Sequence, residues 1–263
     1  MRWLTPLSAT VALGAVLSLC SGAARGSGPH GMVKVQVDSV GGGPEAEAER
    51  YRRLTDEDFE HVADELGVEV AAIKAVVSIE AGAAMKGFWA PGVPVINFDR
   101  TMYRKYAAKV GGGGAKGETV PKGLSGYALR EWTKLINARK SNARAANLGT
   151  FWGMFQIGGF NYKVCGCESV DEFVRLMSYS ELEQLELFAA FLRNTGYVSE
   201  LRALNWAGFA RKYNGPSYAR RGYHTRMAKA YAKFKAEESN RSRFSRSEGI
   251  TGRSLKLLDG AAE

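Results

Sequence analysis

The chain has 263 residues, enough for one large domain or two small ones. Hydrophobic residues make up 45% of it and charged residues 24%, a balance that fits an ordinary soluble globular protein. The formal net charge of +9 favours an anionic partner, such as nucleic acid, a membrane surface or a cell-wall polymer, and counts against a cationic one.

The first 23 residues (1–23) have the pattern of a secretory signal peptide. Arg2 supplies a positive start, residues 4–19 are apolar and uncharged, and residues 21–23 are small enough for cleavage. The apolar run is short for a transmembrane helix, so we expect no stable membrane insertion after cleavage. Export to the periplasm or the extracellular medium follows from this pattern. Two alternatives stay open, an uncleaved anchor and, less favoured, a lipoprotein anchored through Cys20.

A flexible spacer is expected over residues 24–53, which are rich in Gly, Ser, Pro, Ala and Glu. The folded domain is expected over residues 54–238. It opens with a capping pattern at residues 55–58, which starts a helix that ends at Leu66.

The next helix carries the most informative residue, Glu80. At helical spacing Ile73, Val76, Val77 and Glu80 share one face, and this face should be buried. Burial disfavours the charged form of a carboxyl group and raises its pKa. A carboxyl that keeps its proton near neutral pH suits a general acid, so Glu80 is a candidate catalyst.

The middle of the chain alternates short elements with loops. A short apolar run at 95–98 predicts a strand, and the basic, aromatic residues 101–108 are compatible with a helix. Four consecutive glycines open residues 111–126, which we interpret as a mobile surface insertion. Residues 127–146 have helical spacing.

The C-terminal part is predicted to be helical. Two capping patterns open helices at 169–178 and 180–194, another helix begins at Asn205, and the last spans 217–237. The Ser- and Arg-rich residues 239–263 predict a disordered tail. The fold is therefore expected to be mainly α, with at most a small sheet.

The cysteines predict neither a disulfide framework nor a metal site. Cys20 would leave with the signal peptide, and Cys165 and Cys167 are too close in sequence for an unstrained disulfide. No His cluster accompanies them, so we expect no metal and no cofactor, and interpret both as small residues in or near the core.

A basic, aromatic stretch at 201–236 contains no Asp or Glu. Its Lys and Arg side chains would attract an anionic wall and its Tyr rings would stack on sugars, or they form a solvated face over an apolar stripe. Nucleic acid is disfavoured, because an exported protein rarely meets it and no nucleic-acid-binding motif is present.

Two further segments are ambiguous when each is taken alone. Gln156 is a polar residue inside the apolar run 151–157, where it would bind a sugar amide or satisfy backbone groups of the core. The run 213–216, Tyr-Asn-Gly-Pro, is typical of a helix stop.

Together with Glu80, these segments resemble the lysozyme-like superfamily, and most closely the N-acetylmuramidase domain common in phage endolysins. The similarity covers most of residues 54–234, and its most specific parts are the Trp-Gly-Met-Phe-Gln-Ile and Tyr-Asn-Gly-Pro segments. The resemblance implies a lysozyme-like α+β fold. It also implies cleavage of the β-1,4 bond between N-acetylmuramic acid and N-acetylglucosamine in peptidoglycan.

By the same resemblance, Glu80 is the catalytic acid. Trp152, Gln156, Tyr213 and Asn214 are expected to bind the glycan strand, and Tyr213 is also expected to hold Glu80 in place. The peptidoglycan glycan strand is then the partner, and we expect a monomer.

The chain departs from the family pattern after the predicted strand. Family members usually have Glu there, followed by His, whereas this chain has Asp99 and, near the His position, Met102. A glycosidase usually needs a second carboxylate, so Asp99 is the candidate partner of Glu80 unless it only caps the next turn. Two other functions stay open: a lytic transglycosylase that uses Glu80 alone, and a non-catalytic peptidoglycan-binding protein.

Overall fold

The computed structural model describes residues 47, 49–82 and 85–259. The predicted signal peptide and most of the predicted spacer lie outside these residues. Within the described part, no helix is both long and apolar enough to cross a membrane.

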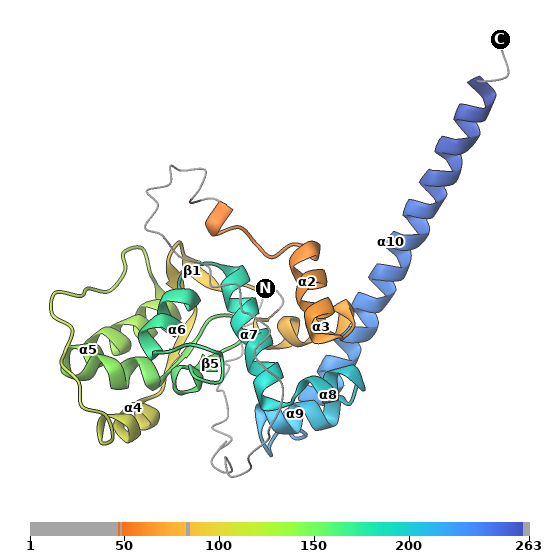
Figure 1. Cartoon of the computed structure of the whole chain (residues 1–263). Helices are drawn as coiled ribbons and strands as arrows, with labels where there is room; N and C mark the ends of the chain where they lie inside the picture. Colours follow the sequence, from red (N-terminus) through yellow and green to blue (C-terminus); the bar gives the residue numbers. More distant parts are fainter. Residues whose placement is uncertain (1–46, 48, 83–84, 260–263) are drawn as a thin grey trace, which may run out of the picture.

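The described chain is mainly helical and has two small antiparallel sheets, as the sequence predicts (Figure 1). One sheet contains the strands β1 and β2, and the other has the order β3-β4-β5. In chain order the elements are α2 (Asp56–Leu66), α3 (Val70–Glu80), β1 (Phe88–Ala90), β2 (Val93–Pro94), β3 (Ile96–Phe98), α4 (Arg100–Ala107), α5 (Gly126–Leu148), β4 (Thr150–Trp152), β5 (Ile157–Gly158), the 3-10 turn η1 (Gly159–Asn161), α6 (Val170–Met177), α7 (Glu181–Thr195), α8 (Val198–Arg202), α9 (Trp206–Asn214) and α10 (Tyr223–Asp259).

The helix boundaries follow from local signals in the sequence. Thr55 accepts a hydrogen bond from the Asp58 backbone and completes the predicted capping box of α2. Ser169 and Ser180 cap α6 and α7 in the same way, through the backbone N–H three residues on. Gly67 ends α2 in the left-handed conformation, with φ +61°, which favours glycine.

The three-stranded sheet has two different faces. Ile96 pairs with Trp152, and both side chains are fully buried. Asn97 pairs with Phe151 in the next register position, and both of these residues are only half-buried. Because side chains alternate across a strand, one face of the sheet lies on the core and the other is open. The indole of Trp132, on α5, packs edge-on against Trp152, so α5 covers the buried face.

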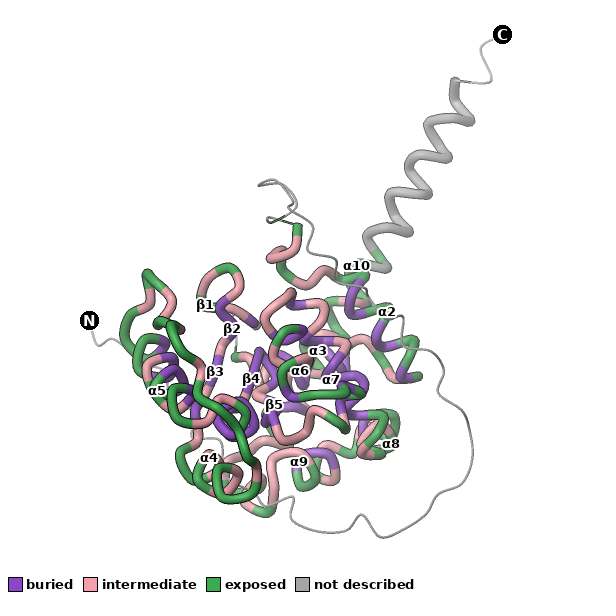
Figure 2. The backbone as a smooth tube through the Cα atoms, turned by 60° about the vertical axis from the view of Figure 1, so that its left-hand side comes forward, coloured by how far each residue is buried: buried purple, intermediate pink, exposed green. Residues whose placement is uncertain are grey.

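The elements form two groups that meet at α7 (Figure 1). Helices α4, α5 and α6 gather with the sheets on one side, and α2, α3, α8, α9 and α10 gather on the other. Helix α3 packs against both α2 and α10, and seven consecutive residues of it, Ala71 to Val77, are buried (Figure 2). The predicted apolar stripe of Ile73, Val76 and Val77 is thus confirmed. Glu80, which follows the stripe, is the last residue of α3.

The C-terminal prediction needs a correction. Helix α10 begins at Tyr223 rather than 217 and continues to Asp259, so the backbone of most of the predicted disordered tail, 239–263, is helical. No Gly or Pro follows Gly222 until Gly249, and Ala, Lys, Glu and Arg in this stretch are strong helix formers. The end of α10 leads away from the body in Figure 1.

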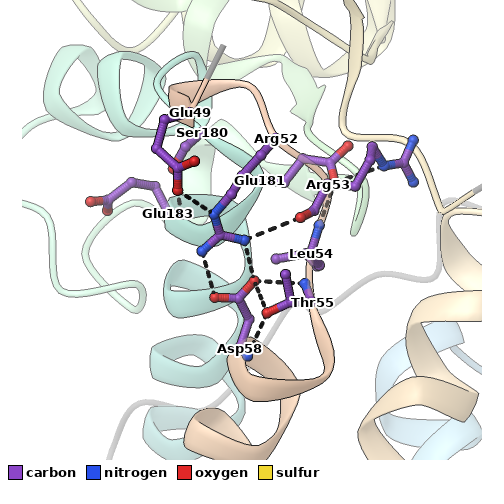
Figure 3. Close-up of polar contacts among 9 residues, drawn as sticks. All are labelled: Glu49, Arg52, Arg53, Leu54, Thr55, Asp58, Ser180, Glu181 and Glu183. Carbon is purple, nitrogen blue, oxygen red and sulfur yellow. Dashed lines mark hydrogen bonds and ion pairs between the residues drawn. The ribbon is translucent and has the colours of Figure 1, made fainter. Parts of the chain in front are cut away.

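The boundary at residue 54 also shifts. The Arg52 guanidinium donates two hydrogen bonds to Asp58, at 2.6 and 2.9 Å, and lowers the pKa of that carboxyl (Figure 3). Arg53 forms an ion pair with the buried Glu181 at 3.1 Å. The last residues of the predicted spacer are therefore attached to the folded domain.

Candidate active site

Glu80 lies at the C-terminal end of α3, where the Asn214 side chain reaches it. Asn214 Nδ2 donates a hydrogen bond to Glu80 Oε1 at 3.0 Å. Although Glu80 keeps some accessible surface, the surrounding protein desolvates its carboxyl group and raises its pKa to about 7. The Asn214 hydrogen bond and, to a smaller degree, the positive charge of Arg226 oppose this rise in pKa.

Asn214, and not Tyr213, makes the hydrogen bond to Glu80, whereas the sequence suggested that Tyr213 holds the acid in place. The Tyr213 hydroxyl donates to the Phe155 carbonyl at 2.7 Å, and its ring stacks on Phe209 at 5.5 Å. Tyr213 therefore joins α9 to the segment that contains Gln156, whereas Asn214 contacts Glu80. Asn214 makes the hydrogen bond to Glu80, and Tyr213 lies close enough that burial and, second, the charge of Glu80 raise the pKa of its hydroxyl.

Gln156 sits in a tight turn between β4 and β5. Its backbone adopts φ +49°, uncommon for a residue with a side chain, and its Nε2 donates to the Gly153 carbonyl at 2.8 Å. The residue is half-buried, so part of its amide stays accessible. The structure thus shows a backbone partner and a half-buried position, and the glycan-binding role remains a proposal.

Gly153 allows a close approach between the β4–β5 turn and α7, where its partner is Gln184. A Cβ at Gly153 would lie 2.8 Å from Gln184 Oε1 and 2.9 Å from Met177 Sδ. Gln184 is fully buried; it accepts from Met154 N at 2.8 Å and donates to the carbonyls of Gly87 and Met177. It ties the turn before Gln156 to the loop after Glu80.

The sequence reasoning missed Gln184, although a signal was present. Gln184 is four residues before Phe188 and three after Glu181, so it continues the buried face of α7 as a polar residue. A buried amide needs hydrogen-bond partners, so a Gln on that face predicts a side chain that joins several backbone segments.

Glu181 binds the loop that follows Glu80 at the same residue as Gln184, Gly87, and it also contacts the segment before α2, which Figure 3 shows. Its Oε1 accepts from Gly87 N at 2.9 Å, and its Oε2 accepts from Leu54 N at 3.3 Å. Arg53, the ion-pair partner of Glu181, also donates to the Met85 carbonyl. The segment before α2 is therefore linked to the loop next to the candidate acid.

Trp152 does not bind substrate in this arrangement, contrary to the sequence-based prediction. The side chain has no accessible surface, and its Nε1 donates to the Asn147 carbonyl at 3.1 Å. Its register opposite Ile96 turns it toward α5, into the core. A residue on the next position of the strand, Phe151, is the one that faces the open side.

We expect Trp152→Phe to reduce stability without changing substrate affinity. The variant leaves the buried Asn147 carbonyl without its indole donor and opens a small cavity, at a cost of about 1–3 kcal/mol. Urea denaturation measures the loss, and the KM for peptidoglycan should stay unchanged. A raised KM with unchanged stability would instead indicate that Trp152 binds the substrate.

Asp99 is the N-cap of α4. Its Oδ1 accepts a hydrogen bond from Met102 N at 2.8 Å, and its own N–H donates to the Gly149 carbonyl. The groups that shift the pKa of Glu80 are Asn214 and Arg226, with no carboxylate among them. The structure therefore gives Asp99 the capping role that the sequence left open and offers no contact that supports a catalytic role.

Asp99→Ser separates the capping role from a catalytic one. Serine caps helices about as well as aspartate but has no carboxylate, so stability and kcat should both remain near wild type. Asp99→Ala should lose about 1 kcal/mol of stability and retain kcat. A loss of kcat of about 100-fold or more in Asp99→Ser would instead establish a catalytic carboxylate.

The two cysteines within the described residues are buried and unpaired, as predicted. Burial raises the pKa of both thiols. In the part of the chain that the structure describes, no cluster of His, Cys, Asp and Glu has the geometry of a metal site.

A mainly helical domain with small antiparallel sheets and a half-buried glutamic acid at the end of a helix is the arrangement expected of the lysozyme-like fold. The N-acetylmuramidase family model matches residues 69–235. The chain belongs to the N-acetylmuramidase family.

Comparison with solved structures agrees with this assignment. The crystal structure of a Burkholderia AP3 phage endolysin is similar, with a TM-score of 0.59 and 35% sequence identity, over 71% of this chain and 72% of that one. A search of curated proteins finds no match. The family and the solved structure together confirm the predicted resemblance and the predicted fold class.

Proposed function

We propose that this protein is an exported muramidase that cleaves the β-1,4 bond between N-acetylmuramic acid and N-acetylglucosamine, with Glu80 as the general acid. The observation that carries the proposal is the half-buried Glu80 carboxyl at the end of α3, which Asn214 holds by a hydrogen bond and whose pKa burial raises to about 7. A carboxyl group with this pKa is half protonated at neutral pH, as a donor to the glycosidic oxygen needs to be.

The contacts of Glu80 suggest how it works. Asn214 donates to Oε1, which leaves Oε2 to carry the proton to the leaving-group oxygen. Bond cleavage converts the acid into a carboxylate, and Asn214 and Arg226 both favour that charged form. The same two groups therefore stabilise the product of proton transfer, while burial keeps about half of the acid protonated at neutral pH.

A second polar atom in the site suits an N-acetylated sugar. Asn214 Oδ1 is buried and, among the described residues, has no hydrogen-bond partner. Asn214 as a residue is only half-buried, so a small rotation of its side chain would let Oδ1 accept the acetamido N–H or a hydroxyl of a bound sugar. We propose Asn214 and Gln156 as the polar contacts to the glycan, and the net charge of +9 as the source of attraction to the anionic wall.

A lytic transglycosylase acting on the same bond is the second candidate, and the capping role of Asp99 favours it. A hydrolase of the usual kind has a second carboxylate roughly 5–10 Å from the acid. A transglycosylase needs none, because a hydroxyl of the muramic acid itself attacks and forms an anhydro ring.

Mass spectrometry of the released muropeptides tests both candidates. Purified peptidoglycan is digested with the wild-type protein, and with Glu80→Gln as the blank. Reducing N-acetylmuramic acid ends establish the proposed hydrolase, and anhydro ends establish the transglycosylase. Release of no fragment while the protein still pellets with the wall would overturn both and leave a binding protein.

A further inference from the structure

The structure contains a cationic groove between α4 and α5 that the catalytic proposal does not use. This α4–α5 groove has a volume of about 530 Å³, within the range of ligand pockets. The two helices lie side by side on the sheet side of the molecule, and α4 has no fully buried residue (Figures 1 and 2). Its lining includes Arg100, Tyr103, Arg104, Lys134, Asn137 and Ser141.

The charges in the α4–α5 groove are arranged for an anion. Arg100 and Arg104 are four residues apart on α4, so their side chains project from the same side. Both are exposed, and neither forms an ion pair with any residue that the structure describes. A guanidinium fork matches a carboxylate with two parallel hydrogen bonds.

The acidic groups nearest to the α4–α5 groove are already engaged. Asp99 caps α4 through Oδ1, and the buried Glu131 accepts from Phe98 N at 3.0 Å and pairs with Lys134 at 2.6 Å. No acidic residue lines the groove itself. Asn137 and Ser141 add uncharged polar groups on the α5 side, where they can bind peptide amides.

The α4–α5 groove is connected to the candidate active site by a single strand. Gly153, in the turn before Gln156, donates to the Val95 carbonyl, and Asp99, next to Arg100, donates to the Gly149 carbonyl. Residues 95 and 99 flank the strand β3, and this extended stretch of four residue steps spans about 13 Å. An extended stem peptide of four or five residues spans about 13–18 Å, so it reaches the groove from a sugar bound near Gln156.

We propose that the α4–α5 groove binds a carboxylate of the peptide stem of peptidoglycan, through Arg100 and Arg104. This inference rests on the proposed action on glycan strands and adds a subsite for the stem that those strands carry. It makes the protein selective for wall material that still bears its peptides.

Kinetics on two substrates test the proposal. The substrates are intact peptidoglycan and glycan strands whose stems an amidase has removed. On intact peptidoglycan, R100Q/R104Q should raise KM about tenfold with kcat unchanged, since two charge-assisted contacts are lost. On bare strands, the wild type and R100Q/R104Q should have the same KM.

The control removes the same charge elsewhere. Lys163, after η1, and Arg175, on α6, are exposed and lie outside the groove and outside the basic stretch 201–236, so K163Q/R175Q should leave KM on intact peptidoglycan near wild type. An equal rise in K163Q/R175Q would attribute the effect to net charge and overturn the subsite. An equal rise on bare strands, or none on intact peptidoglycan, would also overturn it. The subsite would also be overturned if the KM difference between the wild type and R100Q/R104Q persisted after stem removal but disappeared when phosphate polymers were removed from the wall.

Calorimetry gives a readout that does not depend on catalysis. A synthetic stem peptide is titrated into full-length Glu80→Gln, with and without R100Q/R104Q. Binding that R100Q/R104Q weakens about tenfold supports the α4–α5 groove, and equal binding overturns it. If the wild-type protein cleaves neither substrate, the proposed function fails, and this titration still decides the subsite.

Discussion

Glu80→Gln should lower kcat on peptidoglycan by about 10³-fold and leave the fold intact. The amide has nearly the same shape as the acid but cannot donate a proton to the leaving group, and general acid catalysis is worth about 10²–10⁴-fold. Turbidity clearing and product release measure kcat, and circular dichroism checks the fold. Wild-type clearing by the variant would remove Glu80 from the mechanism.

The pH dependence gives the same variant a second signature. The wild-type kcat/KM should fall above pH 7, because the acid form of Glu80, with a pKa of about 7, is lost there. The residual activity of Glu80→Gln should lack this decline. A decline with the same midpoint in both proteins would assign the titration to another group.

The raised pKa of Glu80 should also make the stability of the folded protein depend on pH. The pKa of Glu80 is raised from its usual 4.5 to about 7 in the folded protein, so the native state binds more protons between these values. The stabilisation is complete below pH 4.5 and is lost as pH rises through 7. Because Gln cannot ionise, Glu80→Gln lacks this loss. From pH 4.5 to 8 its free energy of unfolding should rise relative to that of the wild type, by up to about 3 kcal/mol. Parallel stability curves would contradict the raised pKa.

Asn214→Ala should have the second largest effect, a fall in kcat of about 10–100-fold with a shifted pH profile. Asn214 donates to Glu80 Oε1, and this bond lowers the pKa of Glu80 against the effect of burial. Its loss raises that pKa further, so the decline of activity should move to higher pH. The acid also loses the contact that fixes its orientation, which weakens proton transfer.

The pH profile separates positioning from a structural role for Asn214. A purely structural residue would lower the melting temperature and leave the midpoint of the activity decline near pH 7. Asn214→Gln, which keeps an amide donor, should recover part of kcat and return the midpoint toward the wild-type value. An unchanged midpoint in Asn214→Ala would show that the hydrogen bond to Glu80 has no part in its acidity.

Several parts of the fold were predictable because their signals are local. The cap of α2 at Thr55, the glycine stop at Gly67 and the apolar stripe before Glu80 depend on residues a few positions apart. The strand β3 was also visible as a short apolar run. The partner strand β4 was interpreted as part of a core segment, because its pairing with β3 spans more than 50 residues of chain that no local pattern records.

The sequence by itself determined Glu80 as the candidate acid, since burial of a carboxyl group follows from helical spacing alone. Only the tertiary structure decided what surrounds it. The contact of Asn214 with Glu80 joins residues 134 positions apart, and the burial of Trp152 depends on which way β4 faces when it pairs with β3. The capping role of Asp99 required the start of α4. Local spacing specifies which face of an element is apolar, whereas the partners of a polar group depend on how distant elements pack together.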